Sequence, residues 1–282
     1  MVYQTIKSQL ASAGIEAADF EARILFEDIA GLSLSDLVNG GGRDLPPEIH
    51  HKIFSIVKRR VAGESLWRIL GYRDFWKSRF YLSDDTLEPR PDTETLIEEV
   101  LRETDRSGFS PQKILDLGTG TGCILLSLLQ EYQTATGVGI DLAKGACLTA
   151  AQNATHLGLQ DRVKILNGSW FDPLPPDSRF DLIVSNPPYI PTEEIRNLDS
   201  IVQNHDPILA LDGGKDGLSP YKYLCSNLKK YLEPGGIVFF EFGVGQVDDL
   251  TRIVEETGAT LIRVADDLGG HPRVLKFRYG DN

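Results

Sequence analysis

The sequence predicts an α/β protein in which a small helical domain precedes a mostly parallel sheet of seven strands. From Lys113 onward, short apolar runs alternate with helical segments, as strands and crossover helices do in an open parallel sheet. Before Gly71, apolar residues recur at helical spacing. The expected boundaries are 1–71 for the helical domain, 72–91 for a hairpin linker and 92–282 for the sheet domain.

Composition and charge limit the classes of function. The 282 residues are 41% hydrophobic and 25% charged, which is ordinary for a globular enzyme with a substantial core. A net charge of −12 argues against a broad nucleic-acid surface, which needs clustered lysine and arginine. Three scattered cysteines indicate reduced thiols, and the histidines show no metal-ligand spacing. Because no signal peptide or long apolar run opens the chain, we expect a cytoplasmic protein with no membrane contact, no metal and no direct nucleic-acid partner.

The first domain should consist of helices. Apolar residues between Ala18 and Gly31 follow helical spacing, and Gly31 is a plausible end for that helix. Gly40–Gly42 predicts a loop, and Pro46-Pro47 then opens a second helix. The basic run Lys58–Arg60 suits the last turn of that helix, with a binding patch as the alternative. No nucleophile or phosphate loop occurs here, so the domain is interpreted as a docking module.

An aromatic-rich stretch connects the two domains. Tyrosine, phenylalanine and tryptophan between Ile69 and Leu87 suggest a hairpin whose rings pack against its neighbours. In the following helical segment, Asp92 is expected to be the N-cap. Arg90 has no evident structural role and is therefore assigned to the site.

The sheet domain contains seven candidate strands. They are Lys113–Leu117, Gly137–Asp141, Val163–Leu166, Phe180–Ser185, Gly236–Glu241, Leu261–Val264 and Val274–Tyr279. Helices are expected at Gly122–Glu131, Lys144–Leu157, Leu218–Tyr231 and Val247–Thr257. The short Gly269-Gly270 connection allows the last two strands to form an antiparallel edge pair.

A glycine-rich turn follows the first of these strands. Glycines allow a backbone to approach a ligand closely, and the next helix offers unpaired N–H groups at its start. A nicotinamide fingerprint would require glycine at position 123, where Cys123 stands. Asp141 ends the next strand, where a carboxylate can accept bonds from two ribose hydroxyls. The turn consists of Gly118, Thr119, Gly120, Thr121 and Gly122.

A second unusual stretch follows the strand Phe180–Ser185. Two prolines cannot donate to a ladder, so the strand must end at Asn186. The Asn186 side chain, free carbonyls and an aromatic ring then lie together, and such a group can hold a planar NH2. The alternative is a strand-ending turn with a tyrosine packed beneath it. The stretch consists of Asn186, Pro187, Pro188 and Tyr189.

These features should meet at one place. In an open parallel sheet the binding crevice lies at the carboxyl ends of the strands. That edge collects Gly118–Gly122, Asp141, Ser169-Trp170 and Asn186–Tyr189. Any one of them can be a structural turn, but four at one edge predict a binding site.

The combination resembles class I S-adenosylmethionine-dependent methyltransferases and, more narrowly, the protein-(glutamine-N5) methyltransferases that modify class I peptide chain release factors. Matching segments span almost the whole chain. They are Asp19–Ala22 with Leu25, Pro89–Glu94, Leu115–Gly122, Ser185–Ile190, Asp206-Pro207, Ala210–Leu218 and Asp267–Gly270 with Arg273.

The resemblance implies the cofactor S-adenosyl-L-methionine, a release factor as protein substrate, and a monomer. It implies that the Asn186 side-chain oxygen and the Pro187 carbonyl accept the two N–H bonds of a glutamine amide, while Tyr189 covers the amide plane. Pro188 and Arg90 would complete the substrate side, and Asn186 also lies beside the cofactor. The glycine turn would line the methionine end of the cofactor, Asp141 the ribose and Trp170 the adenine. Two departures are Ser169, where many relatives carry an acid, and Glu88, where an apolar residue is usual.

Two alternatives stay open from sequence. A DNA adenine-N6 methyltransferase would use the same grip on an exocyclic NH2, but it must hold phosphates and flip a base. The charge of −12 and the absence of a long basic insert count against it. A cofactor-binding scaffold without activity is the other alternative, and the intact Asn186–Tyr189 stretch argues against that.

Overall fold

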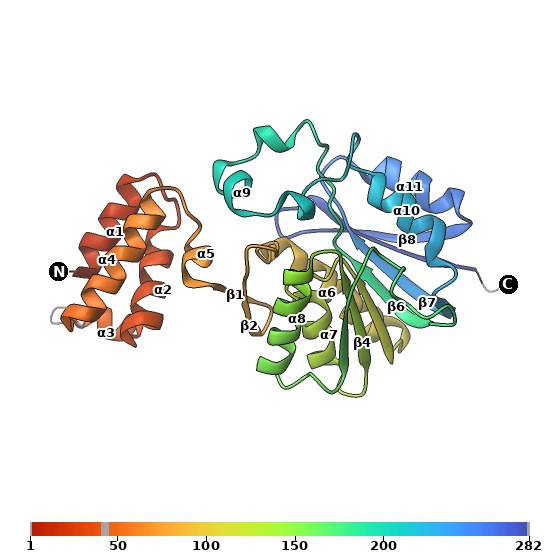
Figure 1. Cartoon of the computed structure of the whole chain (residues 1–282), viewed down its shortest axis with the longest axis horizontal. Coiled ribbons are helices and arrows are strands. Elements are labelled where there is room, and N and C mark those ends of the chain that lie inside the picture. The colour runs from red at the N-terminus through yellow and green to blue at the C-terminus, as the bar shows by residue number, and fades with distance from the viewer. Residues whose placement is uncertain (1, 41–44, 281–282) are drawn as a thin grey trace. The chain divides into compact units, whose positions relative to one another are not determined.

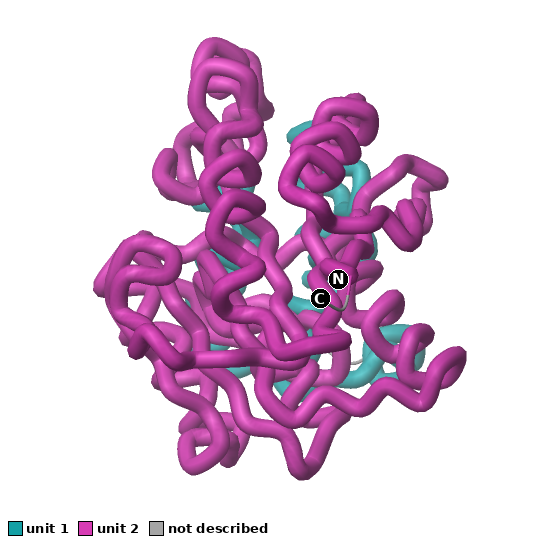
Figure 2. The backbone as a smooth tube through the Cα atoms, turned by 90° about the vertical axis from the view of Figure 1, so that its right-hand side faces the viewer, with its two compact units in different colours: residues 1–71 teal, residues 72–282 magenta. Residues whose placement is uncertain are grey.

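The computed structural model describes residues 2–40 and 45–280, and these fall into two compact units. The first unit contains residues 1–71 and the second residues 72–282 (Figure 2). Among the described residues, no helix is long and apolar enough to cross a membrane.

The first unit is helical, as predicted. Its core contains Ile6, Leu25, Phe26 and Ile53, all fully buried. Gly31 ends its second helix in the left-handed conformation, with φ of 65°. Two of the three residues of the expected glycine loop, at positions 41 and 42, lie outside the described residues. The helices are α1 (Val2–Ser12), α2 (Ala18–Ala30), α3 (Leu34–Val38), α4 (Pro47–Val61) and α5 (Leu66–Leu70).

The second unit contains the predicted seven-stranded sheet, in the order β5-β4-β3-β6-β7-β9-β8. All neighbours are parallel except β9, which is antiparallel to both β7 and β8. The strands are β3 (Lys113–Leu117), β4 (Thr136–Asp141), β5 (Val163–Asn167), β6 (Phe180–Ser185), β7 (Leu232–Glu241), β8 (Ala259–Asp266) and β9 (Pro272–Tyr279).

The arrangement of the last two strands differs in one respect from the expected edge pair. β9 pairs with β8, as the short glycine connection predicted, but it also pairs with β7 through registers such as Val238↔Phe277. Of these two strands, β8 is therefore the one at the edge of the sheet. An inner position suits β9, because its residues Val274, Leu275 and Phe277 are all buried.

Helices cover both faces of this sheet (Figure 1). Side chains of α6 and α7 pack with Leu182 and Val184 on one face, while α10 and α11 pack with Ile183 on the other. This alternation along β6 is the period of two that a strand imposes. The helices are α6 (Glu94–Ser107), α7 (Cys123–Glu131), α8 (Lys144–His156), α9 (Ser200–His205), α10 (Ser219–Leu228) and α11 (Val247–Glu256).

The expected linker forms part of the second unit. Its hairpin, β1 (Tyr72–Phe75) and β2 (Ser78–Tyr81), places Phe75 and Phe80 in the core with α6 and α7. The Asn153 side chain on α8 bonds both backbone groups of Tyr81, at 2.8 and 3.1 Å. The aromatic residues of this stretch therefore belong to the packing of one unit.

Asp92 is not the N-cap that the sequence predicted. It lies in the 3₁₀ turn η1 (Pro91–Thr93), and α6 starts after it at Glu94 without a side-chain cap. Pro91 opens this turn early, so the Thr93 N–H bonds to the Arg90 carbonyl at 3.1 Å. The Asp92 carboxylate instead lies 3.5 Å from the Arg273 guanidinium.

A candidate active site at the carboxyl edge of the sheet

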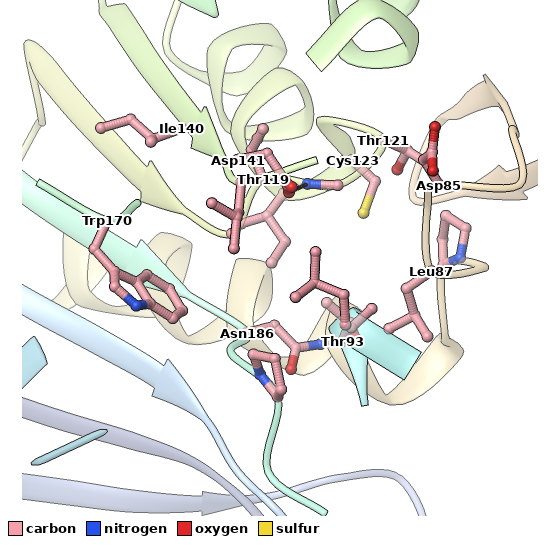
Figure 3. A pocket seen from close by; sticks show the side chains of 18 of the residues that line it. Asp85, Leu87, Thr93, Thr119, Thr121, Cys123, Ile140, Asp141, Trp170 and Asn186 are labelled. Carbon is pink, nitrogen blue, oxygen red and sulfur yellow. Dashed lines mark hydrogen bonds between the residues drawn. The ribbon is translucent and has the colours of Figure 1, made fainter. Parts of the chain in front are cut away.

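A cavity of about 140 Å³ lies at the carboxyl ends of β3, β4 and β6 (Figure 3). It collects side chains from the glycine turn, the ends of three strands and the segment before α6. The predicted site residues that line it are Arg90, Gly118, Thr119, Gly120, Thr121, Asp141, Trp170, Asn186 and Pro188.

The glycine turn depends on left-handed backbone. Gly118, Gly120 and Gly122 have φ of 75°, 55° and 81°, which few other residues adopt. The N–H groups of Gly118 and Thr119 both bond to the Ile140 carbonyl, at 2.9 and 3.0 Å, which joins the turn to β4. Gly122 does not line the cavity; it is the N-cap residue of α7.

Asp141 lies beside this turn at the end of β4. One carboxylate oxygen accepts the Gly120 N–H at 2.8 Å, and the other accepts the Ala143 N–H at 2.9 Å. Each oxygen has a further lone pair, so the carboxylate can still accept a ligand hydroxyl. Burial raises the pKa of Asp141 above its ordinary value.

A second acid, Asp116, is buried beneath the turn. Its Oδ2 accepts the Thr119 hydroxyl at 2.6 Å, and its Oδ1 has no hydrogen-bond partner in the described part of the chain. Burial raises the pKa of this carboxyl to about 7. The acid holds the side of the turn that faces away from the cavity.

Trp170 has an unusual backbone conformation. Its φ is 48°, in the left-handed region that bulky residues avoid at a cost of about 1–2 kcal/mol. The indole ring lies against the turn, 3.7 Å from the position of a Cβ added to Gly118. Its ring lines one end of the cavity, next to Ser169.

Asn186 stands where β6 ends, and its side chain faces the cavity (Figure 3). Its Nδ2 donates to the Thr93 hydroxyl at 3.3 Å, and its Oδ1 accepts no hydrogen bond from the described residues. The preceding Ser185 hydroxyl donates to the Leu117 carbonyl at 2.6 Å, which fixes this strand end against β3. An acceptor is thereby presented opposite the glycine turn.

Pro187 and Tyr189 do not line the cavity, in contrast to Pro188. The Tyr189 carbonyl accepts the Gln246 side-chain N–H at 3.0 Å. A Cβ on Gly217 would lie 2.4 Å from that carbonyl, and one on Gly243 would lie 2.9 Å from the Tyr189 ring. Tyr189 is thus held closely from both sides, and burial raises the pKa of its phenol to about 12.

Arg90 has a structural role that the sequence did not reveal. Its guanidinium bonds to Asp206 and lies 3.8 Å from Glu88, while it also lines the cavity. Glu88, the residue that departs from the family pattern, is buried and paired with Arg73. The Arg90–Asp206 pair fastens the segment between β6 and α10, whose Leu209 lines the cavity, to the segment before α6.

Several residues of the cavity were not predicted. Thr93 and the pair Leu209-Ala210 belong to the segments Pro89–Glu94 and Asp206–Leu218, which carried the family resemblance and were the available signal. Nothing in the sequence pointed to Asp85 or Leu87. The remaining unpredicted lining residues are Pro89, Cys123, Ile124, Ile140, Leu142 and Gly168. Among the described residues, no group of three or more metal-ligating side chains occurs.

Solved structures with a similar fold are methyltransferases. The hMettl16 catalytic domain in complex with MAT2A 3'UTR hairpin 1 matches with a TM-score of 0.57 at 16% identity, over 84% of this chain and 82% of that one. The Thermus thermophilus 16S rRNA N2 G1207 methyltransferase, in complex with AdoMet and guanosine, matches with a TM-score of 0.53 at 18% identity. The match covers 74% of this chain and 49% of that one. At such low identity the likeness establishes the fold alone.

Sequence comparisons identify the family. Residues 2–71 match the PrmC N-terminal domain, and residues 109–264 match a methyltransferase domain. A release factor glutamine methyltransferase of Agrobacterium fabrum is 41% identical over 276 residues, 96% of this chain and 94% of that protein. A release factor glutamine methyltransferase of Rhodospirillum rubrum is 42% identical over 270 residues, which cover 96% of this chain and 82% of that protein. The chain, a methyltransferase, belongs to the family of release factor glutamine methyltransferases.

Proposed function

We propose that this enzyme transfers a methyl group from S-adenosyl-L-methionine to the side-chain amide nitrogen (N5) of a glutamine in a class I peptide chain release factor. The observation that carries the proposal is the acceptor Oδ1 of Asn186, which faces the same cavity as the glycine turn and Asp141. The names of the relatives supply the identity of the acceptor protein.

The residues present fit the cofactor. The backbone of Gly118–Thr121, the carboxylate of Asp141 and the ring of Trp170 line one continuous cavity, and they suit an amino-acid tail, a ribose and a purine. Gly122 supports this set as the N-cap of α7. When bound, S-adenosyl-L-methionine supplies an electrophilic methyl group on its sulfonium.

The protein then has to orient a weak nucleophile. An amide nitrogen is unreactive because its lone pair is delocalised into the carbonyl. We assign Asn186 Oδ1 and the Pro187 carbonyl to accept its two N–H bonds, and Tyr189, with Pro188, to cover the amide plane. Such positioning contributes roughly 7–11 kcal/mol in the best oriented systems. Asn186 is neutral, so its role is orientation and not general-base catalysis.

The assignment of Arg90 changes in this proposal. Its pair with Asp206 fastens the segment that carries Leu209 beside the cavity, so Arg90 shapes the substrate side. A cytoplasmic monomer that acts on protein fits the net charge of −12, because phosphate-rich acceptors would be repelled.

The proposal is tested by offering methyl-labelled S-adenosyl-L-methionine with release factor, adenine-containing duplex DNA and ribosomal RNA in parallel. We expect label in the release factor, on one glutamine. Label in DNA alone would show an adenine-N6 methyltransferase instead.

An Asn186→Ala variant accompanies this assay. Because Asn186 would bind the acceptor amide, we expect its loss to lower transfer at least ~100-fold. Cofactor affinity, measured by calorimetry, should stay close to that of the wild type. Full transfer by this variant would show that Asn186 does not bind the acceptor amide.

A further inference from the structure

We propose that Glu241 is a positioning residue whose ionised carboxylate, together with the Thr93 hydroxyl, fixes the orientation of the Asn186 side-chain amide. The inference rests on the proposed function in one respect, namely that the acceptor group is an NH2 that must meet Oδ1. It adds a proton-dependent element behind the cavity that neither the glycine turn nor the Asn186–Tyr189 stretch contains.

Three elements bring the three side chains together. β6 and β7 are parallel neighbours in which Ser185 pairs with Phe240, so Asn186 and Glu241 follow at adjoining strand ends. Thr93 comes from the turn before α6 and is 2% exposed, and Glu241 is 1% exposed. The Asn186 Nδ2 lies 3.3 Å from the Thr93 hydroxyl. Hydrogen bonding by the side chains of Thr93 and Asn186 lowers the pKa of Glu241, although less than burial raises it.

The direction of these bonds depends on the charge of Glu241. An ionised carboxylate only accepts, so both the Thr93 O–H and the Asn186 Nδ2 donate toward it, and the Thr93 oxygen also accepts from Asn186 Nδ2. That order leaves Asn186 Oδ1 toward the cavity. A protonated carboxyl can instead donate to Thr93, whose O–H then donates to an Asn186 turned over by 180°. The turned amide presents its own NH2 to the acceptor NH2, and two donors form no hydrogen bond.

Glu241 can change charge near neutral pH. Burial is the main reason that its pKa is raised, to about 7. Arg273 on β9 favours the ionised form, and Asp92 in η1 opposes it. The other titratable groups facing Glu241 have a raised pKa and stay uncharged at this pH. They are the phenols of Tyr189 and Tyr221 and the thiol of Cys123.

A purely structural role does not explain this carboxyl. Its Oε2 has no hydrogen-bond partner in the described part of the chain, and burying an unsatisfied carboxyl lowers stability. Glutamine of nearly equal shape would fill the space without a charge. Buried carboxyls with a raised pKa are characteristic of functional sites.

The experiment measures kcat at saturating acceptor and cofactor from about pH 5.5 to about pH 8.5. In the wild type we expect kcat to fall about tenfold for each pH unit below an inflection near 7. Glu241→Gln should lack this inflection and lose kcat at pH 8 on the order of tenfold. Thr93→Ser should keep the full inflection and Thr93→Val should reduce its amplitude, with cofactor KM unchanged in both. An inflection that persists in Glu241→Gln would overturn the proposal.

The matched control is Glu99→Gln, another buried glutamate of the same unit. Glu99 lies on α6, away from the cavity, and pairs with Arg102 and Arg263. We expect this variant to keep the wild-type pH profile. Loss of the inflection here as well would show that any buried glutamate produces it and would contradict the proposal.

A spectroscopic measurement on the wild type tests the inference even if Glu241→Gln does not fold or no release factor is methylated. The Asn186 side-chain NH2 signals, assigned by their absence in Asn186→Ala, should shift with pH at a midpoint near 7. Signals that do not change through this range would overturn the inference independently of any acceptor. Absence of transfer to release factor, with the shift present, would instead contradict the proposed function alone.

Discussion

At the scale of single residues, the two acids Asp116 and Asp141 lie near each other but have different surroundings. Asp141 lines the cavity and accepts two backbone N–H bonds. Asp116 is fully enclosed and bonds to one hydroxyl. A buried carboxyl with so few donors binds its proton more tightly than it does in the unfolded chain.

This difference predicts a pH-dependent stability effect of Asp116→Asn. The pKa of Asp116 is about 7 in the folded protein, against an ordinary value of 3.8 in an unfolded chain. Because the folded pKa is raised, the stability present below pH 3.8 is lost as pH rises through 7. At pH 8 the variant should therefore be more stable than the wild type by up to about 4 kcal/mol, at about 1.4 kcal/mol for each pH unit.

Urea denaturation at several pH values measures this. The advantage of Asp116→Asn should shrink steadily as pH falls toward 4. An advantage that does not depend on pH would show that the Asp116 carboxyl does not titrate in this range.

Local chemistry explains which site residues could be predicted from the sequence. The glycine turn and Asn186–Tyr189 are continuous stretches whose composition alone indicates a ligand. The structural role of Arg90 could not be predicted because its partner, Asp206, lies 116 positions away in sequence. Neither Thr93 nor Glu241 could be recognised as a site residue from the sequence. Each lies close to Asn186 only in the folded chain, where η1 and β7 bring them there.

At the scale of elements, the position of Tyr189 depends on two loops that pack closely against it. The loop before α10 contributes Gly217, and the loop after β7 contributes Gly243 and Gln246. These loops place the stretch after β6 without contributing to the cavity lining. The distance from Tyr189 to Gly217 leaves no room for a side chain.

Gly217→Ala should therefore impair catalysis specifically. The added Cβ would lie 2.4 Å from the Tyr189 carbonyl, so the stretch that carries Asn186 must shift. A displacement of about 1 Å can lower kcat on the order of 100-fold, while cofactor affinity should change little. Gly258→Ala is the control, because it has a comparable φ of 80° and nothing within 4 Å of its Cβ. Equal losses in kcat would mean that backbone strain and not the contact is responsible.

Most elements were predictable because each strand is a short apolar run with a clear boundary. β3 and β6 have the predicted bounds, since Gly118 ends one and Pro187 stops the other. The insertion of β9 between β7 and β8 was not predictable. Both strands are short apolar runs in the sequence, and only in the complete sheet is β9 buried along most of its length while β8 is largely exposed.

At the scale of the whole molecule, each unit has its own core. Unit 1 buries Ile6, Leu10 and Phe26 among its helices, and none of its described residues lines the cavity. Unit 2 contains the hairpin β1–β2, the seven-stranded sheet and the described residues that line the cavity. The chemistry therefore belongs to unit 2, and we infer that unit 1 serves recognition of the protein substrate.

Deleting residues 1–71 tests that inference. We expect the remaining protein to bind cofactor, because the described residues that line the proposed cofactor cavity all belong to unit 2. We expect it to lose transfer to an intact release factor, because the inferred docking unit is missing. Transfer to a short peptide containing the glutamine should persist, which separates lost docking from lost catalysis. An unchanged rate on the intact release factor would contradict a docking role.

The inner position of β9 has a consequence for folding of the chain during synthesis. Glu241 pairs with Val274 in the sheet, and Arg273 precedes that residue by one position. During synthesis, β3 to β8 emerge before the strand that must be inserted between two of them. Arg273, which favours the ionised form of Glu241, is therefore added late, so the surroundings of Glu241 behind Asn186 are complete only after β9 has been inserted.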